Sequence, residues 1–275
     1  MAFTKLTYRS ARIAEFLGIK ASAIALFRAA IAGGGYERAR RRLARLELPG
    51  EDYVHVLSHV HNYLQPHTYV EIGVFRGDTL KLVAPSTRVL GIDPEPQLKD
   101  APGANIRIFA KTSDDFFARH DPIVEFDNER VDMAFIDGMH RFEFALRDFM
   151  NIERSCHSRS VIFVHDCYPL DEPSSQREQT PNFWSGDVWC MLILLLKYRP
   201  DLSIHTLAAE PTGLGLIMNT DPGSRVIADN YARLVEEGMQ LRYAMLEPDK
   251  AGALRRFPNE WNRIRALLDS RRAAC

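Results

Sequence analysis

The sequence predicts an α/β fold, in which helices cover a mostly parallel β-sheet. Three observations lead to this prediction. Short apolar runs alternate with helical stretches from residue 68 onward, as βαβ units require. Polar residues gather at the ends of these runs, whereas the runs themselves are apolar. With 275 residues, of which 46% are hydrophobic and 26% charged, the chain suits one elaborated globular domain or one domain with appendages.

Seven strands are expected, with the last one antiparallel to its neighbours. They are placed at residues 68–74, 88–94, 105–110, 131–138, 160–166, 202–208 and 213–219. Helices are expected at residues 51–64, from 77 onward, and at 113–119, 141–154 and 184–198. The two ends of the chain also read as helical. The expected organisation is an N-terminal helical extension (1–50), a core (51–220) and a C-terminal helical extension (221–275).

Composition excludes several classes of partner. A formal net charge of −1 argues against general nucleic-acid binding, which usually shows as a basic excess. Residues 21–35 are the longest apolar candidate for a membrane span, but Arg28 interrupts them and they are too short. The cysteines form no CxxC pair, which favours a reduced, cytoplasmic setting. The amphipathic residues 1–47 suit either assembly into a homo-oligomer or capping of an active site, and spacing does not choose between the two.

A glycine-containing turn follows the first strand of the core, in the segment YVEIGVFRGDTL at residues 69–80. Gly73 and Gly77 allow the backbone to approach a ligand closely. Asp93, twenty residues after Gly73, can accept hydrogen bonds from ribose hydroxyls. A nicotinamide-binding turn has a further glycine between these two positions, where it admits the pyrophosphate. This sequence lacks that glycine, which argues against a dinucleotide cofactor.

Polar residues stand at the ends of all of the first five predicted strands. Ligands of open parallel sheets bind beyond the carboxyl ends of the strands, so these residues are the first candidates for a site. In chain order they are Glu71, Gly73 and Gly77, then Asp93, then Thr112, Ser113 and Asp114, then Asp137 and His140, then His165, Asp166 and Cys167. The sequence therefore predicts one polar site along this edge of the sheet.

Longer motifs resemble those of class I S-adenosylmethionine (SAM)-dependent methyltransferases. VEIGVFRGDTL resembles their first motif, and GIDP resembles the acidic ribose-binding motif after their second strand. VDMAFIDGMHRFEFALRDF, VIFVHDCYP and NFWSGDVWC are similar to the motifs FIDGxHxxExxLxDF, HDCxP and WTGDVWK of a bacterial branch of this family. The resemblance covers residues 51 to 220. Ser185 and Cys190 depart from it, since threonine and lysine are usual there, and this puts substrate contacts at that helix in doubt.

The resemblance implies a Rossmann-like, doubly wound fold that binds SAM. In this family Glu71 and the two glycines would hold the methionine part, Asp93 the ribose, and residues 113–114 would border the adenine. The implied cofactor-binding residues are Glu71, Gly73, Gly77, Asp93, Ser113, Asp114 and Asp137.

Methyl transfer to a hydroxyl requires a general base, or a metal ion that acidifies the oxygen. His140 is the first candidate for the base, because an unperturbed imidazole titrates near neutrality; Asp137 and His165 are the other catalytic candidates. The resemblance places Asp137, His165 and Asp166 where metal-dependent relatives bind a divalent cation such as Mg²⁺, and a histidine ligand shifts the preference toward Mn²⁺. A hydrogen-bonded loop pair of His165 and Asp166 is the alternative that stays open.

Two further segments carry candidate residues. The proline-rich loop after the fifth strand has the length of a lid or binding element, and Arg177, Trp184, Asp187 and Trp189 are its candidates to cover the acceptor. Packing of the tryptophans against the sheet is the alternative. The histidines at positions 55, 59 and 61 have helical spacing, and an exposed or satisfied helix face is favoured there over a metal site.

The leading functional hypothesis is a SAM-dependent methyltransferase (EC 2.1.1.-) that methylates an oxygen of a small molecule. By resemblance, a sugar or a glycosylated metabolite is the favoured acceptor. Two alternatives stay open, namely a cephalosporin-hydroxylase-like enzyme on the same fold and a SAM-binding or oligomeric scaffold protein without turnover.

Overall fold

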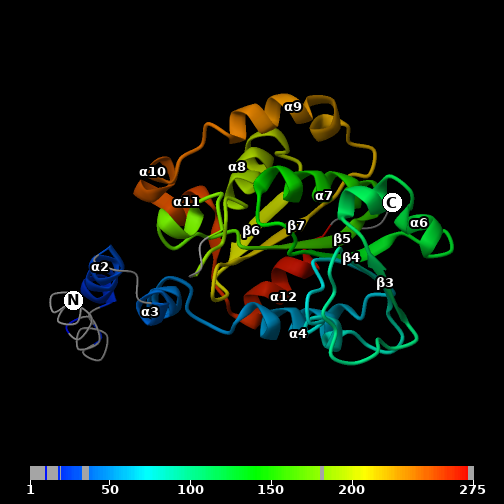
Figure 1. The fold of residues 1–275 in the computed structure, drawn as a ribbon, viewed down its shortest axis with the longest axis horizontal. Coiled ribbons are helices and arrows are strands. Elements are labelled where there is room, and N and C mark those ends of the chain that lie inside the picture. Colours follow the sequence, from blue (N-terminus) through cyan, green and yellow to red (C-terminus); the bar gives the residue numbers. More distant parts are fainter. Residues whose placement is uncertain (1–9, 11–17, 19, 33–36, 180–182, 272–275) are drawn as a thin grey trace.

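An eight-stranded mixed sheet forms the centre of the computed structural model, which describes residues 10, 18, 20–32, 37–179 and 183–271 (Figure 1). The strands are β1 Thr68–Ile72, β2 Arg88–Asp93, β3 Ile106–Ala110, β4 Val131–Ile136, β5 Cys156–His165, β6 Ser203–Leu207, β7 Leu214–Met218 and β8 Arg256–Phe257. Their order across the sheet is β3-β2-β1-β4-β5-β7-β6-β8. Strands β1 to β5 are parallel, and β7 is antiparallel to both of its neighbours. The predicted α/β fold with a mostly parallel sheet is confirmed.

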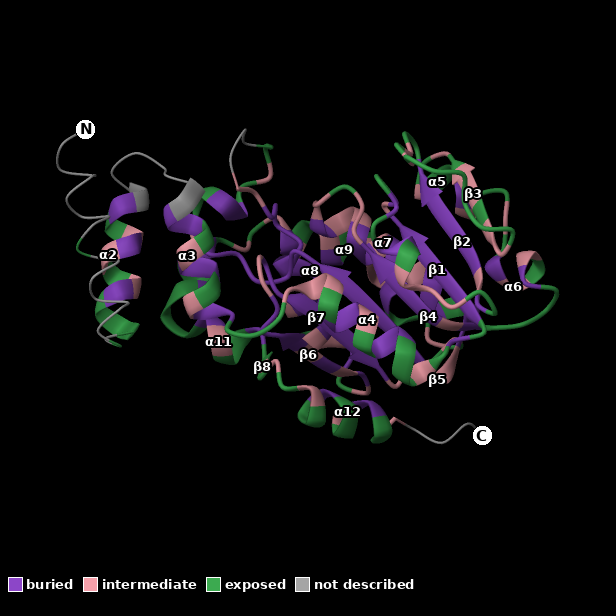
Figure 2. Ribbon diagram, turned by 90° about the horizontal axis from the view of Figure 1, so that it is seen from below, coloured by how far each residue is buried: buried purple, intermediate pink, exposed green. Residues whose placement is uncertain are grey.

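Helices cover both faces of this sheet. They are α2 Lys20–Ala32, α3 Glu37–Glu47, α4 Tyr53–Leu64, α5 Ser113–Phe117, α6 Pro122–Glu125, α7 Phe142–Ser155, α8 Trp189–Tyr198, α9 Val226–Gly238, α10 Tyr243–Leu246, α11 Lys250–Ala253 and α12 Trp261–Asp269. Helices α7, α8 and α9 lie on one side, and α4 and α12 lie on the other (Figure 1). Figure 2 shows the strands buried between them, while α4 and α12 keep an exposed outer surface.

Alternation along the strands assigns each side chain to one face. In β1, Val70 and Ile72 join the core that contains α7 and α8, whereas Tyr69 joins the core that contains α4 and α12. All five residues of β1 are buried, as expected for a strand covered on both faces. By the same alternation Glu71 points toward the α4 side. His165 follows Phe163 on that side at the end of β5, so both strand ends bring a polar group to the α4 face.

The sheet has one strand more than the seven predicted. Strand β8 is two residues long and pairs in parallel with β6, at Thr206 and Leu207. A two-residue strand has no periodicity that a sequence could reveal. The structure therefore corrects the strand count and extends the sheet into the C-terminal segment.

The helix expected from residue 77 onward is a single 3₁₀ turn, Leu80–Leu82. Pro85 disfavours helical backbone at the residue before it, which ends the turn early. Thr79, at the start of the turn, donates its hydroxyl to Glu71 at 2.6 Å and makes no capping bond. The Thr79 hydroxyl, which could otherwise cap a helix, is thus bound to the carboxyl of Glu71 at the end of β1.

The terminal extensions meet at the buried Lys250 of α11. Its Nζ lies 2.7 Å from Glu47 of α3 and donates to the Pro169 carbonyl at 2.8 Å, in the loop after β5. Glu47 also accepts a hydrogen bond from Arg28 of α2 at 2.8 Å. These contacts join α2, α3, α11 and the loop after β5. The domain boundaries at residues 50 and 220 stay a prediction.

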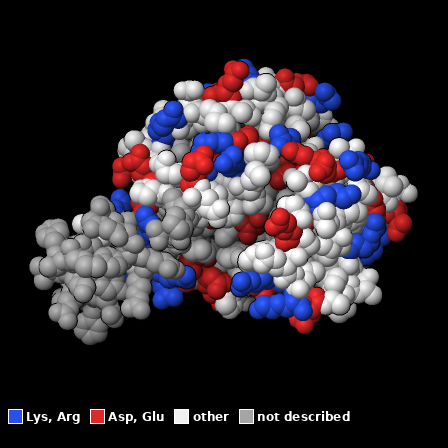
Figure 3. Space-filling model, viewed as in Figure 1, with Lys and Arg blue, Asp and Glu red and all other residues white. Residues whose placement is uncertain are grey.

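Some general properties of the described part bear on the sequence predictions. No helix in it is long and apolar enough to cross a membrane. Basic and acidic side chains are interspersed on the face shown in Figure 3, so neither sign dominates that face. Cys156, Cys167 and Cys190 are buried and free, while Cys275 lies outside the described residues.

His61 is buried on the inner side of α4, which the sequence did not indicate. It is 3% exposed, and neither ring nitrogen has a partner among the described residues. Its ring meets Tyr69 edge-on, at 4.8 Å between centroids. Burial lowers the pKa of His61 from its ordinary 6.5 to about 4. His55 and His59, in contrast, are exposed and each pairs with a carboxylate, as the satisfied-face interpretation expects.

The shift at His61 predicts a loss of stability in mild acid. The unfolded chain binds a proton at His61 below pH 6.5, and the folded chain resists it down to about pH 4, so the unfolding free energy falls across this range. The loss at pH 5 is about 2 kcal/mol. Between pH 7 and pH 5, the unfolding free energy of His61→Leu, measured in urea, should therefore fall by about 2 kcal/mol less than that of the wild type. Asn62→Leu, a change at an exposed and non-titrating position of the same helix, should keep the wild-type dependence. Equal losses in wild type and His61→Leu would contradict the prediction.

Candidate active site

The glycine turn after β1 brings the ends of three strands together. Gly73 has a φ of +87°, and its N–H donates to the Ile92 carbonyl at the end of β2 at 2.9 Å. A Cβ at this position would collide with the Asp137 carbonyl, just beyond β4. Gly77 also has a positive φ, of +71°. The turn therefore requires glycine at position 73 for two reasons, a left-handed backbone and a close approach.

Asp93 fixes the conformation of this turn. Its Oδ2 accepts the Phe75 N–H at 2.7 Å, and its Oδ1 accepts the Glu95 N–H at 2.7 Å. Phe75 has a φ of +45°, which is uncommon for a bulky residue, and its side chain is 52% exposed. A carboxylate has about four lone-pair sites, so Asp93 retains acceptor capacity for ribose hydroxyls.

Glu71 is a fully buried carboxyl at the foot of the turn. Tyr69 donates to one of its oxygens at 2.7 Å and Thr79 to the other at 2.6 Å. Burial raises the pKa of Glu71 to about 8, and the nearby charges of Asp137 and Asp93 add to this. A cationic group bound beside Glu71 would favour its ionised form, so this carboxyl suits the ammonium of an amino acid.

The predicted adenine-side residues lie at the start of α5. Asp114 forms a bidentate pair with Arg147 of α7, with both contacts at 2.6 Å. Ser113 hydrogen-bonds to Asp148, a buried carboxyl that sequence reasoning missed although it lies within the quoted ALRDF motif. Burial raises the pKa of Asp148 to about 7. Asp148 lines the same small pocket as Asp137 and His140, so it joins the candidate site.

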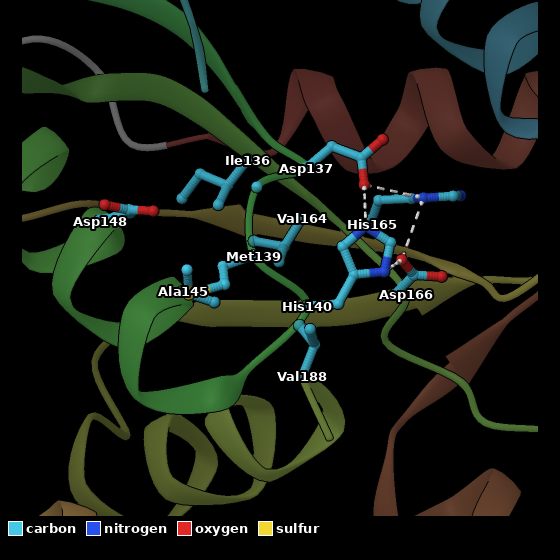
Figure 4. Close-up of a pocket in the computed structure, with 11 residues that line it drawn as sticks. Ile136, Asp137, Met139, His140, Ala145, Asp148, Val164, His165, Asp166 and Val188 are labelled. Carbon is cyan, nitrogen blue, oxygen red and sulfur yellow. Dashed lines mark hydrogen bonds and ion pairs between the residues drawn. The ribbon is translucent and has the colours of Figure 1, made fainter. Parts of the chain in front are cut away.

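Asp137, His140 and Asp166 converge beyond the ends of β4 and β5 (Figure 4). His140 Nδ1 lies 2.7 Å from Asp166 Oδ2, and His140 Nε2 lies 3.7 Å from Asp137 Oδ1. His140 and Asp166 both have left-handed backbone, with φ of +54° and +59°. Left-handed backbone at non-glycine residues is concentrated at functional sites, because the surrounding structure must hold it there.

His165 lies behind this cluster. Its Nδ1 is 3.1 Å from Asp137 Oδ1 and 3.6 Å from Asp166 Oδ2, and its Nε2 is 3.4 Å from the Thr212 hydroxyl. The family resemblance implies a metal-ligand set of Asp137, His165 and Asp166. Among the described residues, Asp137, His140 and Asp166 can bring ligand atoms within 4.8 Å of one another. His165 Nδ1 also lies within 3.6 Å of both carboxylates, so it can orient them, and its role as a ligand stays a prediction.

The two carboxylates control the charge of His140. Burial alone would lower its pKa, but Asp166 and Asp137 outweigh burial and raise the pKa to about 9. Burial likewise acts to raise the pKa of Asp166, and the charges of His140 and His165 overcome it and lower that pKa. In this arrangement His140 keeps its proton at neutral pH, which argues against a free imidazole base.

The cluster fits a divalent cation. His140 Nδ1 and Asp166 Oδ2 are buried and only 2.7 Å apart, yet neither has an aligned hydrogen-bond partner among the described residues. Their contact is therefore mainly electrostatic, and both atoms are arranged as they would be around one cation. Two carboxylates and one imidazole are ligands that Mn²⁺ accepts readily, and Mg²⁺ accepts the carboxylates. Either a proton on His140 or a metal ion can supply the positive charge that the carboxylates require.

The loop after β5 closes over His140. The Trp184 ring stacks on the His140 ring at 5.0 Å, with 5° between the planes. Gly186 has a φ of +65°, and a Cβ there would collide with the His140 carbonyl. Because of this left-handed glycine, α8 begins at Trp189 and not at residue 184 as predicted. Trp184 therefore lies at the site, whereas Trp189 is buried in the core at 3% exposure.

Arg177 and Asp187, the other candidates for the acceptor, hold this loop in place. Asp187 accepts the Phe142 N–H at 2.9 Å, and Arg177 pairs with both Asp187 and Glu143. Ser185, at one of the departures from the family motif, is buried and donates to the Ser174 carbonyl at 3.0 Å. These polar groups are already engaged with the protein, so their role in substrate binding stays a prediction.

Comparison with known proteins relates the central region to methyltransferases. Residues 70–167 match the family model described as a methyltransferase domain, which supports the resemblance found in the motifs. The uncharacterized protein R132 of Acanthamoeba polyphaga mimivirus is 30% identical over 187 residues, which cover 62% of this chain and 80% of that protein.

Two similar solved structures are an O-methyltransferase TomG from Streptomyces achromogenes, in complex with SAM, and an O-methyltransferase from Bacillus cereus, in complex with SAH. The first is 15% identical with a TM-score of 0.46, and covers 67% of this chain and 89% of that chain. The second is 14% identical with a TM-score of 0.45, and covers 64% and 86%.

Proposed function

We propose a function on the premise that this chain belongs to the same family as protein R132 of Acanthamoeba polyphaga mimivirus and matches a methyltransferase domain over residues 70–167. The proposed function is transfer of a methyl group from SAM to a hydroxyl oxygen of a small molecule, with a sugar or a glycosylated metabolite as the favoured acceptor. Asp137, His140 and Asp166 would hold a divalent cation at the strand ends, and this cation would assist the transfer.

One observation carries the proposal. The glycine turn with Glu71 and Asp93 lies directly beside the cluster of Asp137, His140 and Asp166, because Gly73 packs against the Asp137 carbonyl. A nucleoside with an amino-acid tail fits the first group, through a ribose at Asp93 and an ammonium at Glu71. The reacting end of such a cofactor would therefore lie beside the second group.

The residues divide the chemistry between them. SAM supplies an electrophilic methyl group, so the transfer breaks its carbon–sulfur bond, forms an oxygen–carbon bond and releases the hydroxyl proton. The Asp137 carboxylate, which lies 3.1 Å from His165 Nδ1, would take this proton from an acceptor bound beside it. Asp137, His140 and Asp166 would hold a cation, which would lower the pKa of an acceptor hydroxyl. Trp184 covers His140 and limits access of water.

Asp93→Ala tests the cofactor assignment. We expect at least a tenfold loss of affinity for S-adenosylhomocysteine, measured by calorimetry, because ribose hydrogen bonds to a charged group contribute about 1.5–3 kcal/mol. The N–H groups of Phe75 and Glu95, which donate to Asp93, would also lose their hydrogen-bond partner. Urea unfolding must therefore show that the variant is folded. Asp78→Ala, an exposed carboxylate on the same turn, is the matched control. Unchanged affinity in Asp93→Ala would remove the basis for the cofactor.

Turnover and metal are tested together on sugar and phenol probes, with methyl β-glucopyranoside and catechol as the first two. We expect EDTA, or Asp137→Ala combined with Asp166→Ala, to lower turnover by about a hundredfold or more, as loss of proton removal would. Calorimetry should also show that the double variant no longer binds Mn²⁺. Asp127→Ala, an exposed carboxylate far from the cluster, should behave as wild type. Undiminished activity of the double variant would refute the proposed role of a metal ion at Asp137 and Asp166. SAH binding without turnover on any probe would favour a scaffold protein.

A further inference from the structure

Tyr53, the first residue of α4, stands over the strand ends on the same side as Glu71 and His165. Its ring lies on the His165 ring, with 4.1 Å between centroids and 35° between planes, and stacks on Phe135 of β4 at 6.1 Å. The side chain is half-buried, and its hydroxyl has no hydrogen-bond partner among the described residues. Tyr53 therefore brings an unused donor to the edge where the candidate site lies.

The ring contact brings Tyr53 close to the carboxylates of the candidate site. His165, on which the Tyr53 ring lies, has its Nδ1 3.1 Å from Asp137 Oδ1 and 3.6 Å from Asp166 Oδ2. A phenol O–H can donate to a ligand oxygen bound beside these carboxylates without adding charge to the site.

Core packing accounts for the Tyr53 ring but leaves its hydroxyl without a partner among the described residues. Tyr53 is partly buried and packs against the same core as Val56, Leu57 and Val60 of α4. It lies at the N-terminus of the helix, where Asp52 caps the helix by accepting the His55 N–H at 2.9 Å. The ring thus has a packing role, and the hydroxyl is the part of the side chain that a ligand can use.

Contacts from distant segments hold this helix start in place. The Tyr53 N–H donates to the Glu210 carbonyl at 3.1 Å, in the segment between β6 and β7. Asn259, from the segment before α12, donates to the Glu51 carbonyl at 2.7 Å, and Arg256 of β8 donates to the Glu47 carbonyl. The N-terminal extension and the C-terminal segment thus jointly position one aromatic side chain at the site.

We propose that Tyr53 is an acceptor-binding residue, whose ring forms a wall of the acceptor site beside His165 and whose hydroxyl donates a hydrogen bond to an oxygen of the acceptor. This inference rests on the proposed methyl transfer to a hydroxyl. It adds that the acceptor carries a second oxygen, near the hydroxyl that is methylated, because Asp137 and its neighbours already address the first. Sugars and vicinal diphenols belong to this class.

The test compares Tyr53→Phe, Tyr53→Leu and the control Tyr63→Phe. Tyr63 is on the same helix, and its hydroxyl donates to Asp269 at 2.5 Å, on the outer surface between α4 and α12. Calorimetry with catechol and with methyl β-glucopyranoside, in the presence of SAH and Mn²⁺, measures acceptor affinity. SAH alone measures cofactor affinity, and urea unfolding measures stability.

We expect Tyr53→Phe to bind the acceptor probe about tenfold more weakly, the effect of one lost hydrogen bond, and to raise the KM for the probe more than it lowers kcat. Its SAH affinity and stability should equal those of the wild type. Tyr53→Leu should lose more acceptor affinity, because the wall over His165 is also removed. Tyr63→Phe should leave both affinities unchanged.

Two contrary outcomes are distinguishable. If the wild type methylates a probe and Tyr53→Phe binds it equally well, the inference about Tyr53 is overturned and the proposed function stands. If the wild type binds SAH but neither binds nor methylates any oxygen probe, the proposed function fails and this inference fails with it. A parallel loss of SAH affinity in Tyr53→Phe would assign the hydroxyl to the cofactor and overturn the acceptor role.

Discussion

Gly73→Ala is expected to abolish cofactor binding and to destabilise the protein. The backbone at Gly73 is left-handed, with φ of +87°, and an added Cβ would collide with the Asp137 carbonyl. The left-handed conformation costs an L-residue about 1–2 kcal/mol, and overpacking against fixed backbone costs about 1–3 kcal/mol more. The expected loss in unfolding free energy, measured in urea, is therefore about 2–5 kcal/mol.

The same collision explains the expected effect on binding. To relieve it, the turn after β1 must move away from the end of β4, and the turn carries the N–H that pairs with Asp93. A displacement of about 1 Å is enough to cost about a hundredfold where geometry is demanding, so we expect at least that loss of affinity for S-adenosylhomocysteine.

A nearby glycine provides the matched control. Gly138 lies one residue beyond Asp137, has no positive φ, and an added Cβ would meet its nearest neighbour, Ile72, at 3.4 Å. Gly138→Ala should therefore unfold at a urea concentration close to that of the wild type. If Gly73→Ala were as stable as Gly138→Ala and bound the cofactor normally, the close approach would not constrain the site.

The strand ends of the site could be predicted from sequence because local patterns determine them. Apolar runs ending in Glu71, Asp93, Asp137 and His165 identify parallel strands, and parallel strands place their carboxyl ends along one edge. The same reasoning could not choose between the two histidines as the partner of Asp166. That choice depends on the left-handed backbone at His140 and on Gly186, which packs on the His140 carbonyl from 46 residues away.

Other parts depend on contacts distant in sequence. Tyr53 continues the apolar face of α4, which helical spacing can indicate. Its place over His165 also depends on the bond from its N–H to the Glu210 carbonyl and on the bond from Asn259 to the Glu51 carbonyl, which the sequence does not reveal. The sequence gives no signal for strand β8 either, because this strand is defined only by its pairing with β6. The prediction of a helix after Gly77 was wrong for a local reason. The Thr79 hydroxyl donates to the buried Glu71 carboxyl and does not cap a helix.

Arg199→Met is expected to destabilise the fold by about 3–5 kcal/mol without changing the site. Arg199 directly follows α8 and is only 1% exposed. Its guanidinium donates two hydrogen bonds to the Glu153 carboxylate of α7, at 2.7 and 2.8 Å. Glu153 is itself only 3% exposed, so removal of Arg199 leaves a buried carboxylate without its cation. Burial raises the pKa of Glu153 even with Arg199 present, which shows how strongly its charge depends on that partner.

A double variant separates the missing partner from the lost packing. Replacing both Glu153 and Arg199 by methionine removes the unpaired charge, so we expect it to be clearly more stable than Arg199→Met in urea unfolding. Arg225→Met breaks an exposed pair with Asp229 and should change stability little. Glu153 also accepts the Asp221 N–H at 3.1 Å, just after β7, at the opposite edge of the sheet from the site. Affinity for S-adenosylhomocysteine should therefore stay unchanged in Arg199→Met under conditions where it is folded. If the double variant were no more stable than Arg199→Met, the cost would come from packing, and the buried charge would not explain it.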